Sequence, residues 1–391
     1  MWNKIKHFFS KPFWSDYRTM LALWLLLALA AGIAKMGASN NFRIFRGVFW
    51  HVWNQLPLYT EYPAEYFDTN HYGPLFSLVV APFAVVPFPV GLLLWELLLA
   101  LSLYVAVRLL PVKRWNHVLI YWFCAHELLT ALFMNQFNVA IAAIIVGTFV
   151  CVEKERDATA TLLIAIGTLV KLYGIVGLAF FFFSRHKGRF ALSFVCWMAV
   201  LFCLPMLISS PEYIVGQYGA WYESLTAKNS DNMFSLGTNI SLLGMVRKFT
   251  HCATYSDLWL IGPGLLLFAF PYLRTKQLGH IAFRYAWLAS VLMFVVLFST
   301  GSESSGYIIA FVGVAVWYCT VPWQRSRWDI ALMVFAFLLT SMSPSDLFPA
   351  VVRKQIVQPY ALKALPVAII WFKLVYEMMT KDYAQTAENR V

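Results

Sequence analysis

The hydrophobic positions of this chain fall in long runs that are separated by short polar connections. A helix needs about 17–25 apolar residues to cross the hydrocarbon core of a bilayer, and many of the runs approach this length. A chain of such runs has to bury its apolar faces in lipid and against one another. The pattern therefore predicts an all-α polytopic membrane protein.

The order of the runs predicts about twelve spans with both termini on the same side. The segment 74–89 is apolar but short, and it is interrupted by Pro82 and Pro87, so we expect it to be half-inserted. It would extend a first external loop over 37–89, which is followed by external stretches at 209–257 and 343–358. We treat 1–391 as one transmembrane domain. The expected spans are 20–36, 90–110, 116–134, 137–152, 158–170, 175–183, 190–208, 258–273, 283–299, 307–321, 330–342 and 359–379.

Composition agrees with a membrane protein and changes how the charge is interpreted. Hydrophobic residues make up 60% of the 391 positions, charged residues make up 13%, and the mean hydropathy is +0.65. The net charge of +11 does not indicate nucleic-acid binding, because the basic residues gather in short loops between apolar runs. Such loops stay in the cytoplasm. We therefore expect both termini in the cytoplasm and the three external stretches on the opposite face.

The N-terminus and the cysteines add little further chemistry. Lys4, Lys6 and Lys11 precede the first apolar run, which continues into the polar sequence GASNN without a convincing cleavage site, so we expect a retained first helix. The six cysteines are scattered, and none has the spacing of a zinc site or a disulfide framework. The sequence gives no indication of a cofactor or a metal.

The stretch 40–74 gathers arginines, carboxylates and aromatic rings after the first apolar run. Arg43 and Arg46 lie three apart, so a helix would place them on one face, where guanidinium groups suit phosphate. Glu61 and Asp68 could accept a proton from an attacking hydroxyl. The alternatives are an interfacial helix that holds lipid headgroups and a solvated loop face. Tyr72 could contact a sugar or belong to an aromatic belt.

Later polar residues lie at the ends of apolar runs. Lys171 ends one run and could neutralise a lipid phosphate, or it could extend to the interface without a ligand. Gln136 and Asn138 could bind sugar hydroxyls or cap helices. Glu303 is the one carboxylate in a turn of serines and glycines, and it is either a desolvated base or part of a tight external turn.

Glu96 and Glu127 lie inside expected spans. Ionisable residues at this depth are costly, so they are candidates for function. Either carboxyl could instead pair with a neighbour and serve only the structure.

At these residues the chain resembles the integral-membrane glycosyltransferases of the GT-C superfamily. More narrowly, it resembles glycosyltransferase family 87, the polyprenol-phosphate-mannose-dependent type, and especially its Bacteroidota-like members. The resemblance spans about residues 40–320, and the order of five motifs carries it. These motifs read NNFRIFRGVFWHV, LYTEYPAEYFDTNHYGPLFSL, QFN, VKLYG and STGSESSGYI.

The resemblance implies an inverting transfer of a mannose-like hexose from a polyprenyl-phosphate sugar to a lipid-linked or glycan acceptor. The site would face the periplasm, across the bacterial inner membrane. Lys171, Arg43 and Arg46 would hold the donor phosphate, and the partners would be membrane lipids and the two substrates. Many members carry an acidic residue after helix one, but this chain has Asn40 and Asn41 there. We therefore expect base function at Glu303 or Asp68, with Gln136, Asn138, Tyr72 and Glu61 as sugar or headgroup contacts.

Two other functions remain open. A transporter or flippase of lipid-linked sugars would line a mid-membrane path with charges rather than gather them at the external ends of helices. A polysaccharide polymerase or ligase would use arginines in a large late external loop. The loop 209–257 holds only Arg247 and Lys248 beside Lys228, which disfavours that class.

Overall fold

The computed structural model describes residues 11–384, and within that range every regular element is a helix. Lys4 and Lys6 lie outside the described residues. Among these described residues, three helices are long and apolar enough to cross a membrane, namely Tyr17–Lys35, Phe88–Arg108 and Lys187–Leu207. The protein is therefore of the helical membrane type. The count of twelve spans stays a prediction, because the other apolar helices are shorter than a full span.

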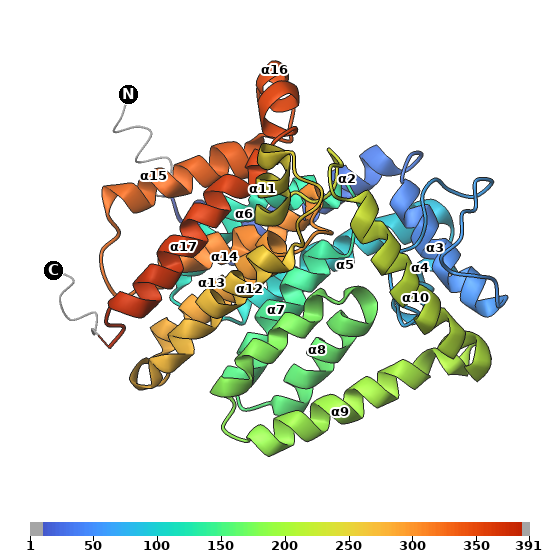
Figure 1. The fold of residues 1–391 in the computed structure, drawn as a ribbon, viewed down its shortest axis with the longest axis horizontal. Coiled ribbons are helices and arrows are strands. Elements are labelled where there is room, and N and C mark those ends of the chain that lie inside the picture. Colours follow the sequence, from blue (N-terminus) through green and yellow to red (C-terminus); the bar gives the residue numbers. More distant parts are fainter. Residues whose placement is uncertain (1–10, 385–391) are drawn as a thin grey trace.

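The first half of the chain runs from α2 to α9 (Figure 1). Its elements are η1 (Pro12–Ser15), α2 (Tyr17–Lys35), α3 (Asn40–Trp53), α4 (Phe76–Ala84), α5 (Phe88–Arg108), α6 (Arg114–Leu132), α7 (Asn138–Glu153), α8 (Asp157–Lys171), η2 (Tyr173–Phe183), α9 (Lys187–Cys203) and η3 (Leu204–Leu207).

The second half begins with the long helix α10 and ends with α17. Its elements are α10 (Pro211–Asp231), α11 (Leu242–Thr250), α12 (Leu258–Ala269), η4 (Phe270–Leu273), η5 (Thr275–Gln277), α13 (Ile281–Leu297), η6 (Ser304–Gly306), α14 (Tyr307–Cys319), α15 (Arg327–Phe335), η7 (Ala336–Met342), α16 (Ala350–Val352), η8 (Arg353–Val357), η9 (Leu362–Ala364) and α17 (Leu365–Thr380).

The centre of the molecule is formed by α7, α13 and α14, which are buried along nearly their whole length. The outer helix α9 buries only Phe190 and Leu201 and leaves other large apolar side chains, such as Leu192 and Val195, exposed. A helix that is apolar on its exposed face suits lipid rather than water. Buried residues from α2 to α17 join in one contiguous hydrophobic core.

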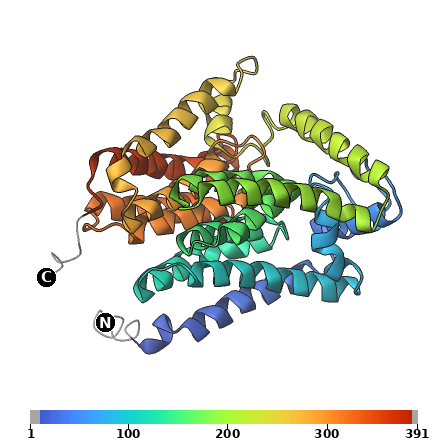
Figure 2. The same cartoon turned by 90° about the horizontal axis from the view of Figure 1, so that it is seen from below.

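The polar stretches 37–73 and 209–257 lie together at one end of the molecule. Figures 1 and 2 both place α3, α4 and α10 at the end opposite the start of α2 and the end of α17. The Leu58 backbone N–H donates to Gln217 Oε1 on α10 at 2.8 Å, which joins the two stretches. This arrangement gathers the expected external loops over the ends of α7 and α8.

Local sequence explains the short helices at this end. The Ser39 hydroxyl accepts a hydrogen bond from the Phe42 N–H at 3.2 Å and so begins α3, and Ser210 caps α10 in the same way. Helix α4 has nine residues, includes Pro82, and ends before Pro87. It therefore has the short, interrupted form expected for 74–89.

Candidate active site

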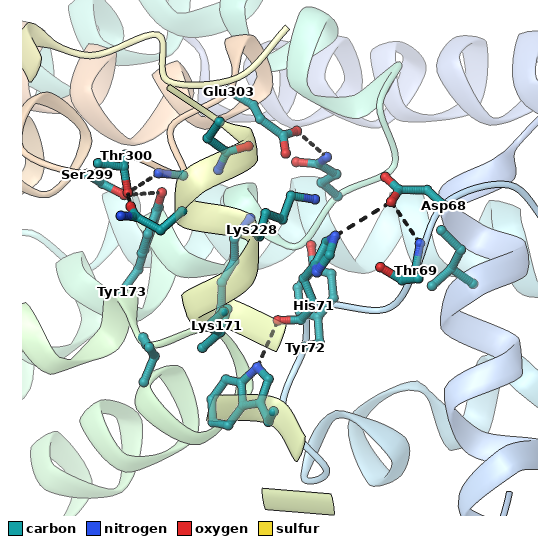
Figure 3. Close-up of a pocket in the computed structure, with 18 of the residues that line it drawn as sticks. Asp68, Thr69, His71, Tyr72, Lys171, Tyr173, Lys228, Ser299, Thr300 and Glu303 are labelled. Carbon is teal, nitrogen blue, oxygen red and sulfur yellow. Dashed lines mark hydrogen bonds and ion pairs between the residues drawn. The ribbon is translucent and has the colours of Figure 1, made fainter. Parts of the chain in front are cut away.

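A cavity of about 290 Å³ lies at the end of the bundle where the polar stretches meet. Its walls come from α3, the loop 68–72, the turn before α7, the end of α8, one face of α10 and the turn 299–303. In Figure 3, Asp68 and His71 lie on one side of this cavity, and Tyr173 with Ser299 lies on the other. Segments far apart in the sequence therefore surround one space.

Four of the predicted residues form a continuous hydrogen-bonded chain beside the cavity. Lys171 Nζ donates to Asn138 Oδ1 at 2.6 Å, and Asn138 Nδ2 donates to Gln136 Oε1 at 2.8 Å. Gln136 Nε2 then donates to Glu303 Oε2 at 2.6 Å. An ammonium and a carboxylate are thus held apart by two amides, and Lys171, Gln136 and Glu303 all line the cavity.

The end of α8 directs Lys171 into this space. The next residue, Leu172, has a φ of 53°, a left-handed conformation that is rare for a leucine. The resulting turn lets Lys171 and Tyr173 line the same cavity. The Lys171 Nζ lies 5.4 Å from the centroid of the Tyr72 ring and 5.5 Å from that of Tyr173. These aromatic faces stabilise a cation without neutralising it.

The first loop reaches the cavity by packing on the end of α8. The Gly73 N–H donates to the Val170 carbonyl at 3.0 Å. A Cβ at Gly73 would lie 2.1 Å from the Leu169 carbonyl oxygen and within 2.9 Å of the Trp221 ring, so only glycine fits there. This close approach places Tyr72 beside Lys171.

Asp68 lies at the rim, where its side chain is 64% exposed. Its Oδ1 lies 3.7 Å from His71 Nε2 and also accepts a 2.8 Å hydrogen bond from the Thr69 N–H. The His71 side chain, together with that N–H, lowers the pKa of Asp68 to about 2. A carboxylate with so low a pKa is a weak proton acceptor.

Helix α10 supplies a wall that the sequence reasoning did not anticipate. Trp221, Leu225, Lys228, Asn229 and Asn232 all line the cavity. Their spacing of four, three, one and three residues places them on one helical face, so the period is visible in the sequence. What the sequence could not show is that this face turns toward Lys171 rather than toward water. The Trp221 indole N–H donates to the His71 carbonyl at 3.0 Å and fixes that orientation.

Arg43, Arg46 and Glu61 are not brought into the cavity. The two arginines share a face of α3, but that face turns toward α4 and α5. Arg46 Nη1 donates to the Val86 carbonyl at 2.6 Å, and the Arg43 guanidinium lies 5.7 Å from the centroid of the Phe88 ring. Glu61 is exposed and lines a neighbouring depression together with Asp68.

The two asparagines of α3 hold the loops in place. Asn40 exchanges two hydrogen bonds with the backbone of Phe67, at 2.6 and 2.8 Å. Asn41 lines the cavity and donates from its amide to the Met134 carbonyl at 2.7 Å. The carboxyls inside expected spans also have partners, because Glu96 accepts from Asn135 and Glu127 pairs with Lys363, both at 2.8 Å.

The cavity opens toward an apolar groove. Tyr173, Ser299 and Thr300 also line a space of about 650 Å³. That space shares Ile175 and Leu258, among others, with an apolar groove of about 1120 Å³ between η2 and α12. The three spaces therefore adjoin one another, from the cavity at Lys171 to a surface lined by aliphatic and aromatic side chains.

Within residues 11–384, no three His, Cys, Asp or Glu side chains come together in a way that could hold a metal ion. The polar groups of the cavity are instead ammonium, amide, hydroxyl and carboxylate groups. The arrangement can bind an anion at Lys171 and accept a proton at Glu303.

Comparison with known proteins places the chain in a family. The model of glycosyltransferase family 87 matches residues 70–300, which is more than half of the chain. No curated protein matches the chain. The matched range includes Tyr72, Gln136, Asn138 and Lys171, and it ends just before Glu303. The chain belongs to glycosyltransferase family 87.

Proposed function

We propose that this family 87 glycosyltransferase moves a mannose-like hexose from a polyprenyl-phosphate sugar to a hydroxyl of a lipid-linked or glycan acceptor. The enzyme would lie in a bacterial inner membrane with its cavity toward the periplasm and both termini in the cytoplasm. The observation that carries the proposal is the chain from Lys171 through Asn138 and Gln136 to Glu303, which holds a cation and a carboxylate apart on the wall of one cavity.

An inverting transfer needs these two groups on opposite faces of the sugar. The acceptor oxygen forms a bond to the anomeric carbon while the bond from that carbon to the phosphate oxygen breaks. The electron pair leaves with the phosphate, whose charge Lys171 would stabilise. The proton of the acceptor hydroxyl passes to Glu303. Gln136 lines the cavity between the two groups, where its amide can bind a sugar hydroxyl, and the buried Asn138 holds Gln136 and Lys171 in place.

The apolar groove supports a lipid-linked donor. A sugar joined to a polyprenyl phosphate needs an anion site that is continuous with an apolar surface. The groove between η2 and α12 adjoins the space of about 650 Å³, and that space meets the cavity at Tyr173, two residues after Lys171. The donor phosphate would lie at Lys171, with its lipid tail along the groove.

Of the two candidate bases, Glu303 fits the role better. Asp68 is exposed and carries a pKa of about 2, so it holds a proton poorly at neutral pH. Glu303 faces the cavity from a turn of small residues and is held by Gln136 at 2.6 Å. We therefore assign proton acceptance to Glu303.

Turnover of purified variants tests this assignment. Purified protein is incubated with a panel of polyprenyl-phosphate sugars, and release of polyprenyl phosphate is followed. We expect Glu303→Gln to lower turnover by about 100-fold or more, as is typical for loss of a general base. Asp68→Asn should keep most of it. Full turnover in both variants would contradict the assignment of either carboxylate as the base.

A groove-filling variant tests the lipid path. Gly262 lines the groove, and a Cβ at this position meets no atom within 4 Å, so a larger side chain can begin there in open space and occupy part of the groove. Gly262→Trp should raise the KM for the donor by about tenfold or more. Gly216→Trp on α10 is the matched control, because Gly216 also has open space and lines none of these cavities. Equal KM values for the two variants would exclude this path for the lipid.

A further inference from the structure

A second cavity, of about 580 Å³, lies on the other side of Glu303. It is bounded by α6, the turn 304–305, the segment 343–358 and Lys363. Among residues 11–384, Glu303 is the one residue that lines both this cavity and the one at Lys171. Unlike the first cavity, the second shares no lining residue with the space of about 650 Å³ that adjoins the apolar groove, and it shares none with the groove itself. Two separate spaces therefore meet at a single carboxylate.

The wall between the two cavities is made of polar side chains rather than packed apolar ones. Ser305 lines the second cavity, and its hydroxyl donates to Gln136 Oε1 at 2.7 Å. The same hydroxyl accepts from Asn138 Nδ2 at 3.0 Å. Gln136 in turn holds Glu303. The carboxylate is thus fixed at the boundary, where it can reach an oxygen that arrives from the second cavity.

The cations of the second cavity already have carboxylate partners. Lys363 Nζ lies 2.8 Å from Glu127 Oε1, and Arg353 Nη1 lies 3.1 Å from Asp346 Oδ1. In contrast, Lys171 forms no ion pair with any described carboxylate, and its hydrogen-bond acceptor is the neutral amide of Asn138. The first cavity is therefore suited to an anion and the second to an uncharged ligand.

The remaining lining of the second cavity suits a sugar. Thr130, Ser343, Ser345 and Gln358 bring hydroxyl and amide groups, and Phe133 offers an aromatic ring. Polar side chains outnumber apolar ones in this lining, and polar groups of fixed position orient a small ligand in its pocket. This cavity shares no lining residue with the groove or with the space beside Tyr173, so a donor lipid that lies in the groove would not extend into it.

We propose that the second cavity binds the acceptor, and that the part of the acceptor bound there is an uncharged, water-borne glycan. This inference rests on the proposed function. The glycan hydroxyl enters from the side of Ser305 and attacks the anomeric carbon of the sugar that lies beside Gln136. A bond forms between the glycan oxygen and that carbon as the carbon–phosphate-oxygen bond breaks, and the proton goes to Glu303.

A pair of filling variants tests the assignment. Gly237 lines the second cavity, and a Cβ there meets no atom within 4 Å, as is true of Gly262 in the groove. Binding of farnesyl phosphate and of three uncharged trisaccharides (α-mannotriose, isomaltotriose and chitotriose) is measured on purified wild type, Gly237→Trp and Gly262→Trp. We expect Gly237→Trp to weaken binding of at least one trisaccharide by about tenfold or more and to leave farnesyl phosphate binding unchanged. Gly262→Trp should do the opposite.

Different results separate the two proposals. If wild type binds none of the trisaccharides, or if Gly237→Trp binds them as wild type does, the second cavity is not the glycan site. If both variants lose the same probe, the two cavities do not have separate ligands. A failure of the proposed function would show itself differently, as a wild-type protein that binds no farnesyl phosphate and releases no polyprenyl phosphate from any donor.

Discussion

Two lysines, Lys171 and Lys363, line the two cavities that meet at Glu303 but have different partners. Lys363 is buried, pairs with Glu127 at 2.8 Å, and donates to the Ser304 carbonyl and hydroxyl at 3.0 Å. Lys171 has an amide oxygen, two aromatic faces and an open cavity around it. One ammonium is neutralised within the protein, and the other is not.

The difference separates a structural cation from one that is available to a ligand. Removing a charge from water is costly unless a partner of opposite charge compensates for it. Glu127 supplies that partner to Lys363, which in turn holds the turn that carries Glu303. For Lys171 a bound anion would supply it. The predictions below test this contrast.

The largest expected effect is on catalysis at Lys171. Lys171→Met should lower kcat/KM for the donor by about 100-fold or more, because it removes the cation that we propose stabilises the leaving phosphate. Its thermal unfolding midpoint in detergent should not fall, since no buried carboxylate loses its partner. A variant that unfolds early would instead give Lys171 a structural role like that of Lys363.

Lys363→Met should act mainly on stability. It leaves Glu127 buried and without its cation, which costs about 3–5 kcal/mol in comparable pairs. The free energy of unfolding, measured by denaturant titration in micelles, checks this. The double variant Glu127→Gln with Lys363→Met should recover part of the loss. No recovery would mean that the contacts of Lys363 to Ser304, rather than its pairing with Glu127, carry the effect.

Gly73→Ala should disturb the packing around Lys171 and leave the contacts of Lys363 unchanged. The added methyl group meets the Leu169 carbonyl oxygen and the Trp221 ring, and such overpacking costs about 1–3 kcal/mol. The lowered unfolding free energy should be accompanied by weaker donor binding. Gly37→Ala is the matched control, because a Cβ at Gly37 meets no atom within 4 Å. If the two variants are equally stable, the loop does not pack on α8 as described.

The smallest expected effect is the pH dependence contributed by Asp68. Its folded pKa of about 2 lies below the usual value of about 3.9, so its ionised form stabilises the folded state. That contribution is present above about pH 4 and is lost as the pH falls through about 2. Thermal unfolding of wild type and Asp68→Asn should therefore differ near neutral pH and converge near pH 2. A constant difference would show that Asp68 does not titrate as its contacts predict.

The polar residues at helix ends could be predicted from the sequence, because a polar group between two apolar runs is expected where one helix ends and the next begins. Gln136, Asn138, Lys171 and Glu303 were found in this way, and the structure brings them together. The partner of Glu127 could not be predicted. It is Lys363, 236 residues away, and their contact depends on the packing of the whole bundle.

Arg43 and Arg46 show another limit. Their spacing predicted a shared helical face, and α3 gives them one. The sequence does not say which neighbour that face meets. In the structure Arg46 satisfies the Phe83 and Val86 carbonyls near the end of α4, carbonyls that lack partners within a helix. Similarly, the apolar pattern predicted helices correctly but could not distinguish a full span from a shorter buried helix, such as α14 (Tyr307–Cys319).

The most direct test of the central claim follows the sugar itself in proteoliposomes. Purified protein is reconstituted with a polyprenyl-phosphate sugar that is radiolabelled in the sugar, together with a glycan acceptor. The account predicts that label leaves the lipid fraction, appears on the glycan, and is matched by an equal release of polyprenyl phosphate. Label that crosses the bilayer while it stays on the lipid, with no polyprenyl phosphate released, would contradict it and would indicate a flippase.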